Sequence, residues 1–126
     1  MKSRTILLID SKQSTRRQRV AMLVTHGYLV RAEESIEELD LPFAGAAPDL
    51  VLLRVDEPPD RAESAYVAIR RAAPNQKIGF LLDDSHYLCE VFVNGILTRR
   101  REALSGDLIE AVSMMLGAKS TCTVAC

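Results

Sequence analysis

PDLVLLRVDEPP, at residues 48–59, decides the fold. Its apolar core, Leu50 to Leu53, is bounded by Pro48 on one side and by the Pro58–Pro59 pair on the other. A short apolar run between turn signals is typical of a strand that is covered on both faces, as in a parallel sheet. The residue that leaves such a strand at its carboxyl end faces the crevice where open α/β folds place their chemistry. Here that residue is Arg54.

Further strand-like runs lie at 6–9, 28–32, 78–82 and 96–98. Each segment that follows one of these strand-like runs has apolar residues at helical spacing, which predicts five helices. Their apolar faces are Val20, Leu23 and Val24; Ile36 and Leu39; Ala62, Ala65, Tyr66 and Ile69; Leu88, Val91 and Phe92; and Leu108, Ile109, Val112, Met115 and Leu116. Alternating strands and helices predict a parallel sheet with helices on both faces. We therefore expect a single-domain flavodoxin-like (βα)5 doubly wound fold of strand order 2-1-3-4-5, over residues 1–117, with a flexible tail at 118–126.

Several local signals mark where these helices begin and end. Gly27 is a helix stop after His26. Ser35 and Glu38 form a capping box for the short second helix. Ser105 is the expected cap of the last helix.

The composition excludes several classes of protein. A formal net charge of −1 over 126 residues gives no electrostatic case for nucleic acid or membrane as partner, and no apolar run approaches membrane-spanning length. Three cysteines and the lack of a signal-peptide pattern favour a reducing cytoplasm. Cys122 and Cys126 lack further ligands for zinc, so we interpret them as incidental thiols.

The chain resembles the receiver domain of two-component response regulators over about residues 4 to 117. The matching stretches are ILLID at 6–10, HGYLV at 26–30, PDLVLLRVDEPP at 48–59, AIRRAAP at 68–74 and NGILTRR at 94–100. The resemblance implies a phosphoacceptor Asp at the end of the third strand and two acidic residues for Mg²⁺ after the first. It also implies a Ser or Thr after the fourth strand and a Lys after the fifth.

This chain departs from that pattern at nearly every functional position. Asp10 matches one acidic residue, but Ser11 stands where the second is expected, and Arg54 replaces the phosphoacceptor. Leu82 replaces the Ser or Thr, and Arg99 replaces the Lys. Two neighbours of Arg99 also differ, with Arg100 at a position usually held by Pro and Ile96 at one often aromatic; Pro58 is retained. The resemblance therefore implies a pseudo-receiver.

Elementary chemistry leads to the same expectation. A guanidinium is a permanent cation with no acceptor atom, so Arg54 is no nucleophile. Mg²⁺ is held through carboxylates and waters. Here the crevice is expected to contain one carboxylate, Asp10, and two cations, Arg54 and Arg99, so its formal charge of +1 should repel Mg²⁺. We expect no metal, no cofactor and no enzymatic activity. A bidentate ion pair of Arg54 with Asp10, with Asp56 or Asp83 in reach, is the expected replacement; the alternative is a solvated Arg54.

Two other groups of residues have a functional and a structural interpretation. Ser11, Ser14 and Thr15 precede a helix, where an anion can bind, but without glycine we expect helix capping. Asp83, Asp84 and His86 suit a metal or acid–base chemistry, yet adjacent acids also suit the start of a helix, and we favour that role.

The sequence predicts a signalling or scaffold module that works through protein–protein contact without aspartyl phosphorylation. Receivers commonly use the surface of the fourth helix, fifth strand and fifth helix for partners or homodimers, which here is expected to include Tyr87, Phe92, Ile96 and Arg100. One alternative is a receiver phosphorylated on Asp10 or Asp56. Another is a sensor of a small anion attracted to Arg54 and Arg99.

Overall fold

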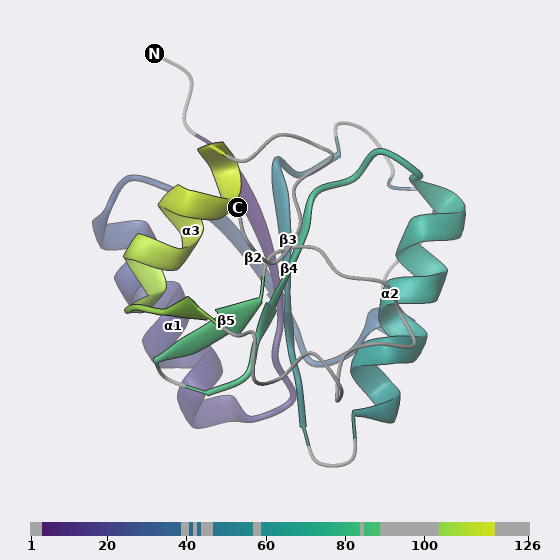
Figure 1. Ribbon diagram of the computed structural model, residues 1–126, viewed down its shortest axis with the longest axis horizontal. Helices are drawn as coiled ribbons and strands as arrows, with labels where there is room; N and C mark the ends of the chain where they lie inside the picture. Colours follow the sequence, from purple (N-terminus) through teal and green to yellow (C-terminus); the bar gives the residue numbers. More distant parts are fainter. Residues whose placement is uncertain are drawn as a thin grey trace.

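The chain forms an α/β structure in which a mostly parallel sheet lies between helices, as the computed structural model in Figure 1 shows. The structure describes residues 4–38, 41, 43, 47–56, 59–83, 85–88 and 104–117. In chain order the elements are β1 (Thr5–Ile9), α1 (Gln13–Thr25), β2 (Leu29–Glu33), the 3₁₀ turn η1 (Ile36–Glu38), β3 (Leu50–Arg54), α2 (Asp60–Ala72), β4 (Ile78–Leu81), β5 (His86–Leu88), β6 (Leu104–Ser105) and α3 (Leu108–Gly117).

The sheet has the order β2-β1-β3-β4-β5-β6. Neighbouring strands from β2 through β4 pair in parallel, with Leu7 opposite Val51 and Val51 opposite Ile78. The order 2-1-3-4 expected from the four apolar runs is therefore confirmed. The connections through α1 and α2 pass across a face of the sheet, which is the usual way to join parallel strands.

The edge beyond β4 differs from the prediction. β5 pairs with β4 in antiparallel fashion, and β6 pairs with β5 in the same way. Leu88, which we expected on the apolar stripe of a helix, is in β5; Val91, Phe92 and the predicted strand 96–98 lie outside the described residues. The cause is a tight turn, in which the Leu82 amide donates to the His86 carbonyl at 3.0 Å. A chain that reverses directly after β4 continues as a hairpin.

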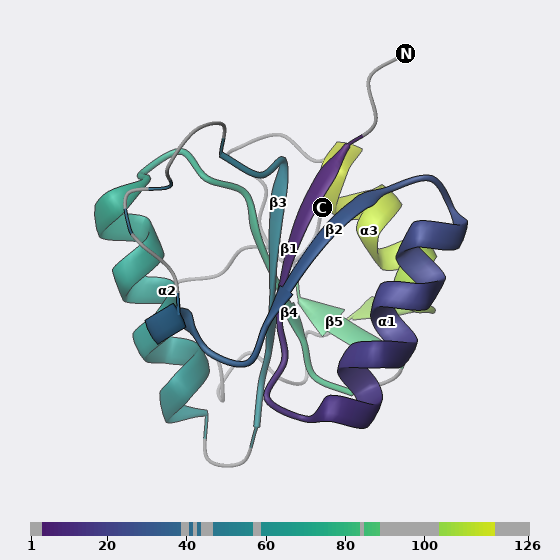
Figure 2. The same ribbon diagram turned by 180° about the vertical axis from the view of Figure 1, so that it is seen from behind.

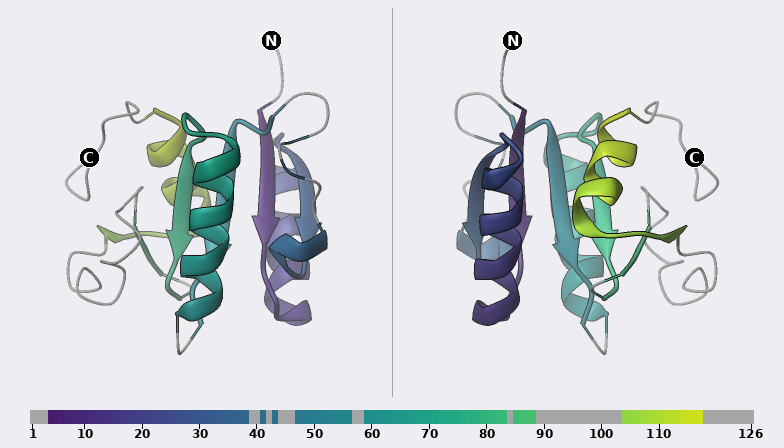
Figure 3. Two further views of the ribbon diagram at one scale, coloured as in Figure 1. Left: turned by 90° about the vertical axis from the view of Figure 1, so that its right-hand side faces the viewer. Right: turned by 90° about the vertical axis from the view of Figure 1, so that its left-hand side faces the viewer.

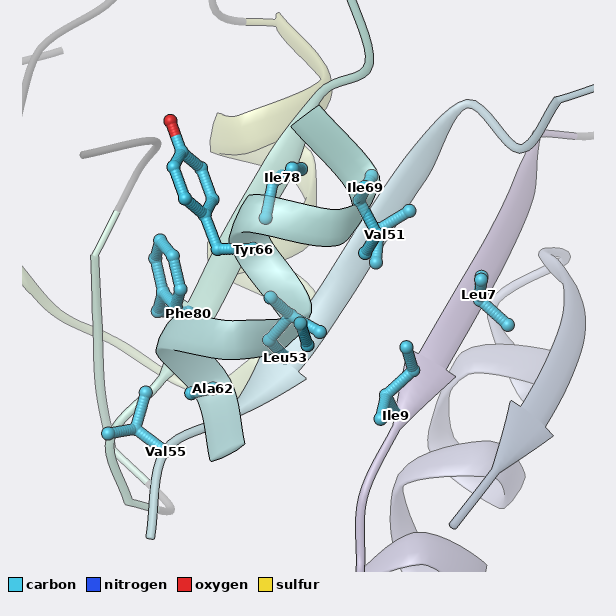
Figure 4. Close-up of a cluster of buried hydrophobic side chains, with 11 residues drawn as sticks. Leu7, Ile9, Val51, Leu53, Val55, Ala62, Tyr66, Ile69, Ile78 and Phe80 are labelled. Atoms are coloured by element: carbon cyan, nitrogen blue, oxygen red, sulfur yellow. The ribbon is translucent and has the colours of Figure 1, made fainter. Parts of the chain in front are cut away.

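Helices cover both faces of the sheet. Figure 3 shows α2 in front of one face and α1 with α3 in front of the other, and Figure 2 shows the same layers from behind. Alternate side chains of β1 and β3 divide between these faces, because successive residues of a strand point to opposite sides. Figure 4 shows the α2 side, where Tyr66 and Ile69 lie over Val51, Leu53 and Phe80.

The apolar faces predicted for the helices are only partly correct. Ala62, Ala65, Tyr66 and Ile69 of α2 are all buried, as expected. In α1, Leu23 is buried, but Val24 is 55% exposed, and the second buried side chain is Arg19. Val20 is partly buried and packs against the same core as Leu23, so α1 packs inward through these two aliphatic residues and Arg19.

The predicted helix ends also need correction. Gly27 does follow α1 with φ +91°, a conformation that favours glycine. The Ser35 capping box introduces only the 3₁₀ turn η1, however. Ser105 lies in β6, and it is Asp107 Oδ1 that accepts the Glu110 amide at 2.8 Å at the start of α3. Among the described residues, no helix has the length and apolar character that a membrane span requires.

Candidate functional site

The candidate site lies at the carboxyl ends of β1 and β3. These strands pair in parallel, with Ile9 opposite Leu53, so the next residues along each strand, Asp10 and Arg54, lie side by side. Ser11 continues from Asp10, and Asp56 follows Arg54 after Val55. The topology thus brings together residues that are 44 positions apart. We call Asp10, Ser11, Thr15, Arg19, Arg54 and Asp56 the Asp10 cluster.

Asp10 is fully buried, and four donors saturate its carboxylate. Oδ1 accepts the Lys12 amide at 2.9 Å and Arg54 Nη1 at 3.3 Å. Oδ2 accepts the Thr15 hydroxyl at 2.7 Å and Arg19 Nη1 at 2.8 Å. Burial alone raises the pKa of Asp10, but the Thr15 and Lys12 hydrogen bonds together with the two guanidiniums outweigh it and hold the pKa below its ordinary value. Asp10 is therefore an anion at neutral pH.

Arg54 bridges two carboxylates. Besides its contact with Asp10, its Nε lies 3.0 Å from Asp56 Oδ1. The Ser11 hydroxyl donates to the other oxygen of Asp56 at 3.0 Å. The expected contact of Arg54 with Asp10 is thus present, but through Nη1 and one carboxylate oxygen instead of as a bidentate pair, and Asp56 rather than Asp83 is the second partner. The Arg54 side chain is 24% exposed, so this guanidinium lines the crevice instead of extending into solvent.

Arg19 is the residue of this cluster that the sequence interpretation missed. It lies at 2.8 Å from Asp10, and its side chain is only 9% exposed. A second arginine of α1, Arg16, donates from Nη1 to the Asp10 carbonyl at 2.8 Å. The available signal was their spacing, because positions 16 and 19 share the face of a helix that begins just after Asp10.

One expectation about this crevice stays untested and another is wrong. The formal charge of +1 depended on Arg99, which lies outside the described residues; within the described part of the crevice, Asp10 and Asp56 are paired with Arg19 and Arg54. Ser11 and Thr15 do not cap α1, because their hydroxyls donate to Asp56 and Asp10. The N-cap of α1 is Lys12, without a side-chain hydrogen bond, and Ser14 is exposed.

The predicted partner face also needs correction. Tyr87 was expected to be exposed, but it is 2% exposed and packs in the core beneath α3. Its position in β5 points the ring toward the α1–α3 side of the sheet, where it is covered. Phe92, Ile96 and Arg100 lie outside the described residues. Leu82, at the position of the family's Ser or Thr, is partly buried against the core on the α2 side.

Asp83 and His86 form a turn and not the start of a helix. Asp83 Oδ1 accepts the Ser85 amide at 2.8 Å and lies 3.0 Å from His86 Nδ1. The Ser85 amide is the main reason that the pKa of Asp83 lies below its ordinary value. These contacts fix the hairpin between β4 and β5, while Asp84 lies outside the described residues.

The charged side chains of the Asp10 cluster are paired with one another. Within the described ranges, no three His, Cys, Asp or Glu side chains converge as a metal site. Asp10 is enclosed, and Arg54 lacks a nucleophilic atom. Asp56, 32% exposed, is the carboxylate of the cluster that solvent reaches.

Comparisons of this chain with protein-family models, with curated proteins and with solved structures found no match.

Proposed function

We propose that this chain is a degenerate receiver-type module that acts in two-component-type signalling through protein–protein contact, without phosphorylation at position 54. The observation that carries the proposal is the place of Arg54. It stands at the carboxyl end of β3, where the resemblance implies a phosphoacceptor, and it pairs with both Asp10 and Asp56.

The proposal includes a flavodoxin-like, doubly wound fold. The parallel order 2-1-3-4 supports this, as do helices on both faces of the sheet. The antiparallel β5 and β6 depart from five parallel strands, and they place the buried Tyr87 where a receiver continues into a helix. The departure lies away from the Asp10 cluster, which belongs to the parallel part.

Charge balance explains why such a module has no need of a phosphoryl group. In a receiver, several carboxylates converge and a divalent cation offsets their repulsion. Here Arg54 and Arg19 provide the positive charge permanently. Both guanidiniums are cations at every physiological pH, so the crevice keeps one arrangement. A signal would then pass by binding of a partner or of a second copy, and not by a change of charge at Arg54.

The proposal is tested by intact-mass spectrometry after incubation of the full chain with acetyl phosphate and Mg²⁺. An active receiver treated in the same tube serves as positive control. We expect the control to gain the mass of a phosphoryl group and this chain to remain unchanged. A gain on this chain that disappears in Asp56→Asn would overturn the proposal in favour of a phosphorylatable receiver.

In the same experiment, Asp10→Asn tests whether the other acidic residue of the crevice accepts a phosphoryl group. Because Asp10 is buried and saturated with donors, a gain that depends on it would require the Asp10 cluster to open. Circular dichroism of each variant checks that loss of labelling does not reflect loss of fold. Light scattering of the untreated and treated chain reports whether the oligomeric state responds to the donor; a constant state is expected.

A further inference from the structure

A pocket of about 430 Å³ lies beside the Asp10 cluster, on the α2 side of the sheet. Its apolar walls come from the carboxyl ends of β1 and β3 and from α2, through Ile9, Leu53 and Ala65. Ile36 of η1 lines the opposite side. Pockets of this size accept small organic molecules, and an apolar wall favours a ligand with an apolar body.

Charged groups at this pocket are mostly acidic. Asp56, Asp60, Glu34 and Glu37 line it, against Arg54 and Arg61. Arg54 already pairs with Asp56, and Arg16 lies 4.0 Å from Glu34. Neither Glu37 nor Asp60 has an ion pair with another described residue. Asp60 also offsets the positive end of α2, which lowers but does not remove its attraction for a cation.

We propose that this pocket binds a small organic cation, an amine with an apolar body. The body would lie on Ile9, Leu53 and Ala65, and the ammonium group would face Glu37, Asp60 and the exposed edge of Asp56. This goes beyond the signalling role proposed above and does not depend on it. An anion is the weaker candidate because Arg54 already contacts two carboxylates, and the other arginine of the lining, Arg61, is opposed by both Glu37 and Asp60.

The pocket and the crevice share residues, so a ligand in one would affect the other. Ser11, Arg54 and Asp56 line the pocket and also belong to the Asp10 cluster. An ammonium group beside Asp56 competes with Arg54 for the same carboxylate. Binding of the amine is therefore expected to alter the environment of Ser11 as well as that of the pocket walls.

The test uses three probes that share one body and differ in charge: 2-phenylethylamine, 2-phenylethanol and 3-phenylpropionate. Each is titrated into the ¹⁵N-labelled full chain, and amide shifts are followed at Ile9, Ser11, Ala62 and Ala65. We expect saturable shifts with the amine and an affinity for it about five times that for the carboxylate, as exposed charge contacts allow. Added salt should reduce this preference.

Variants separate the pocket from general electrostatic attraction. Glu37→Gln and Asp60→Asn should each weaken amine binding by about two- to fivefold, the effect of one exposed ion pair. Glu63→Gln, also in α2 but outside the pocket lining, is the charge-matched control and should change little. Ser64→Phe should block the pocket, whereas Ser113→Phe on α3 is the size-matched control.

Three results would overturn the proposal. They are tighter binding of the carboxylate than of the amine, unchanged affinity in a folded Ser64→Phe variant, and absence of saturable shifts with any probe. Thermal unfolding of each variant verifies that it is folded.

Discussion

The two arginines that pair with Asp10 should contribute unequally to stability. Arg19 Nη1 lies 2.8 Å from the carboxylate and Arg54 Nη1 lies 3.3 Å from it. Coulomb energy falls with distance, so distance alone favours Arg19 by only about a sixth. Burial matters more, since the Arg19 side chain is 9% exposed and that of Arg54 is 24% exposed. Water screens the second pair better than the first.

Substitution by Met retains much of each aliphatic stem while removing the charge. Arg19→Met should lower the free energy of unfolding by about 3–5 kcal/mol, the cost of breaking a buried pair. Arg54→Met should cost about 1.5–3 kcal/mol, the range for a hydrogen bond to a charged group. Asp10 retains Arg19 in that variant, and the partly exposed contact with Asp56 adds at most about 1 kcal/mol.

Urea unfolding at neutral pH measures both values, and a double-mutant cycle with Asp10→Asn assigns them. The coupling energy of Asp10 with Arg19 should reach about 2–3 kcal/mol and exceed that with Arg54. If Arg54→Met destabilises the chain as much as Arg19→Met does, or if Asp10 and Arg19 show coupling below about 0.5 kcal/mol, burial does not rank these pairs and the reasoning fails.

Three further outcomes are expected. The pKa of Asp10 is lower in the folded chain than in the unfolded chain, so its contribution to stability is complete above about pH 4 and is lost as the pH falls through the folded value. In Asp10→Asn, the free energy of unfolding measured in urea should therefore decrease less as the pH is lowered below about 4. A Cβ at Gly79 would overlap Met115 Sδ and Cε, the end of a flexible side chain, so Gly79→Ala should cost about 1 kcal/mol, the low end for overpacking, and Met115→Val in the same chain should recover part of it. Leu23→Ala should cost about 2–5 kcal/mol, whereas Val24→Ser one position later should stay within about 0.5 kcal/mol, and equal melting temperatures for the two would contradict the orientation of α1.

The parallel half of the fold was predictable because three of its strands, β1, β3 and β4, are short runs of mainly apolar residues. Leu50 to Leu53 and Ile78 to Leu81 have one explanation, burial on both faces. The antiparallel edge was not predictable in this way. Leu88 forms a helix-like spacing with Val91 and Phe92, and a strand as short as β5 is too brief to show alternation.

The contact of Arg54 with Asp10 was predictable from topology, whereas the helix spacing of Arg16 and Arg19 was too weak a signal to predict that Arg19 is buried. Strand ends that are adjacent in a parallel sheet bring their following residues together, whatever those residues are. Arg19 belongs to a helix in which sequence patterns assign arginine to solvent. The buried carboxylate of Asp10 next to it reverses that preference, and its burial depends on the tertiary structure.

The two partners of Asp10 also differ in how far they lie along the chain. Arg19 is 9 residues away and Arg54 is 44 residues away. Closing the longer segment costs about 1.4 kcal/mol more in chain entropy than closing the shorter one. Because synthesis proceeds from the N-terminus, Arg19 can neutralise Asp10 before Arg54 has been synthesised. Assembly of the central strand then adds its arginine to an anion that already has a partner.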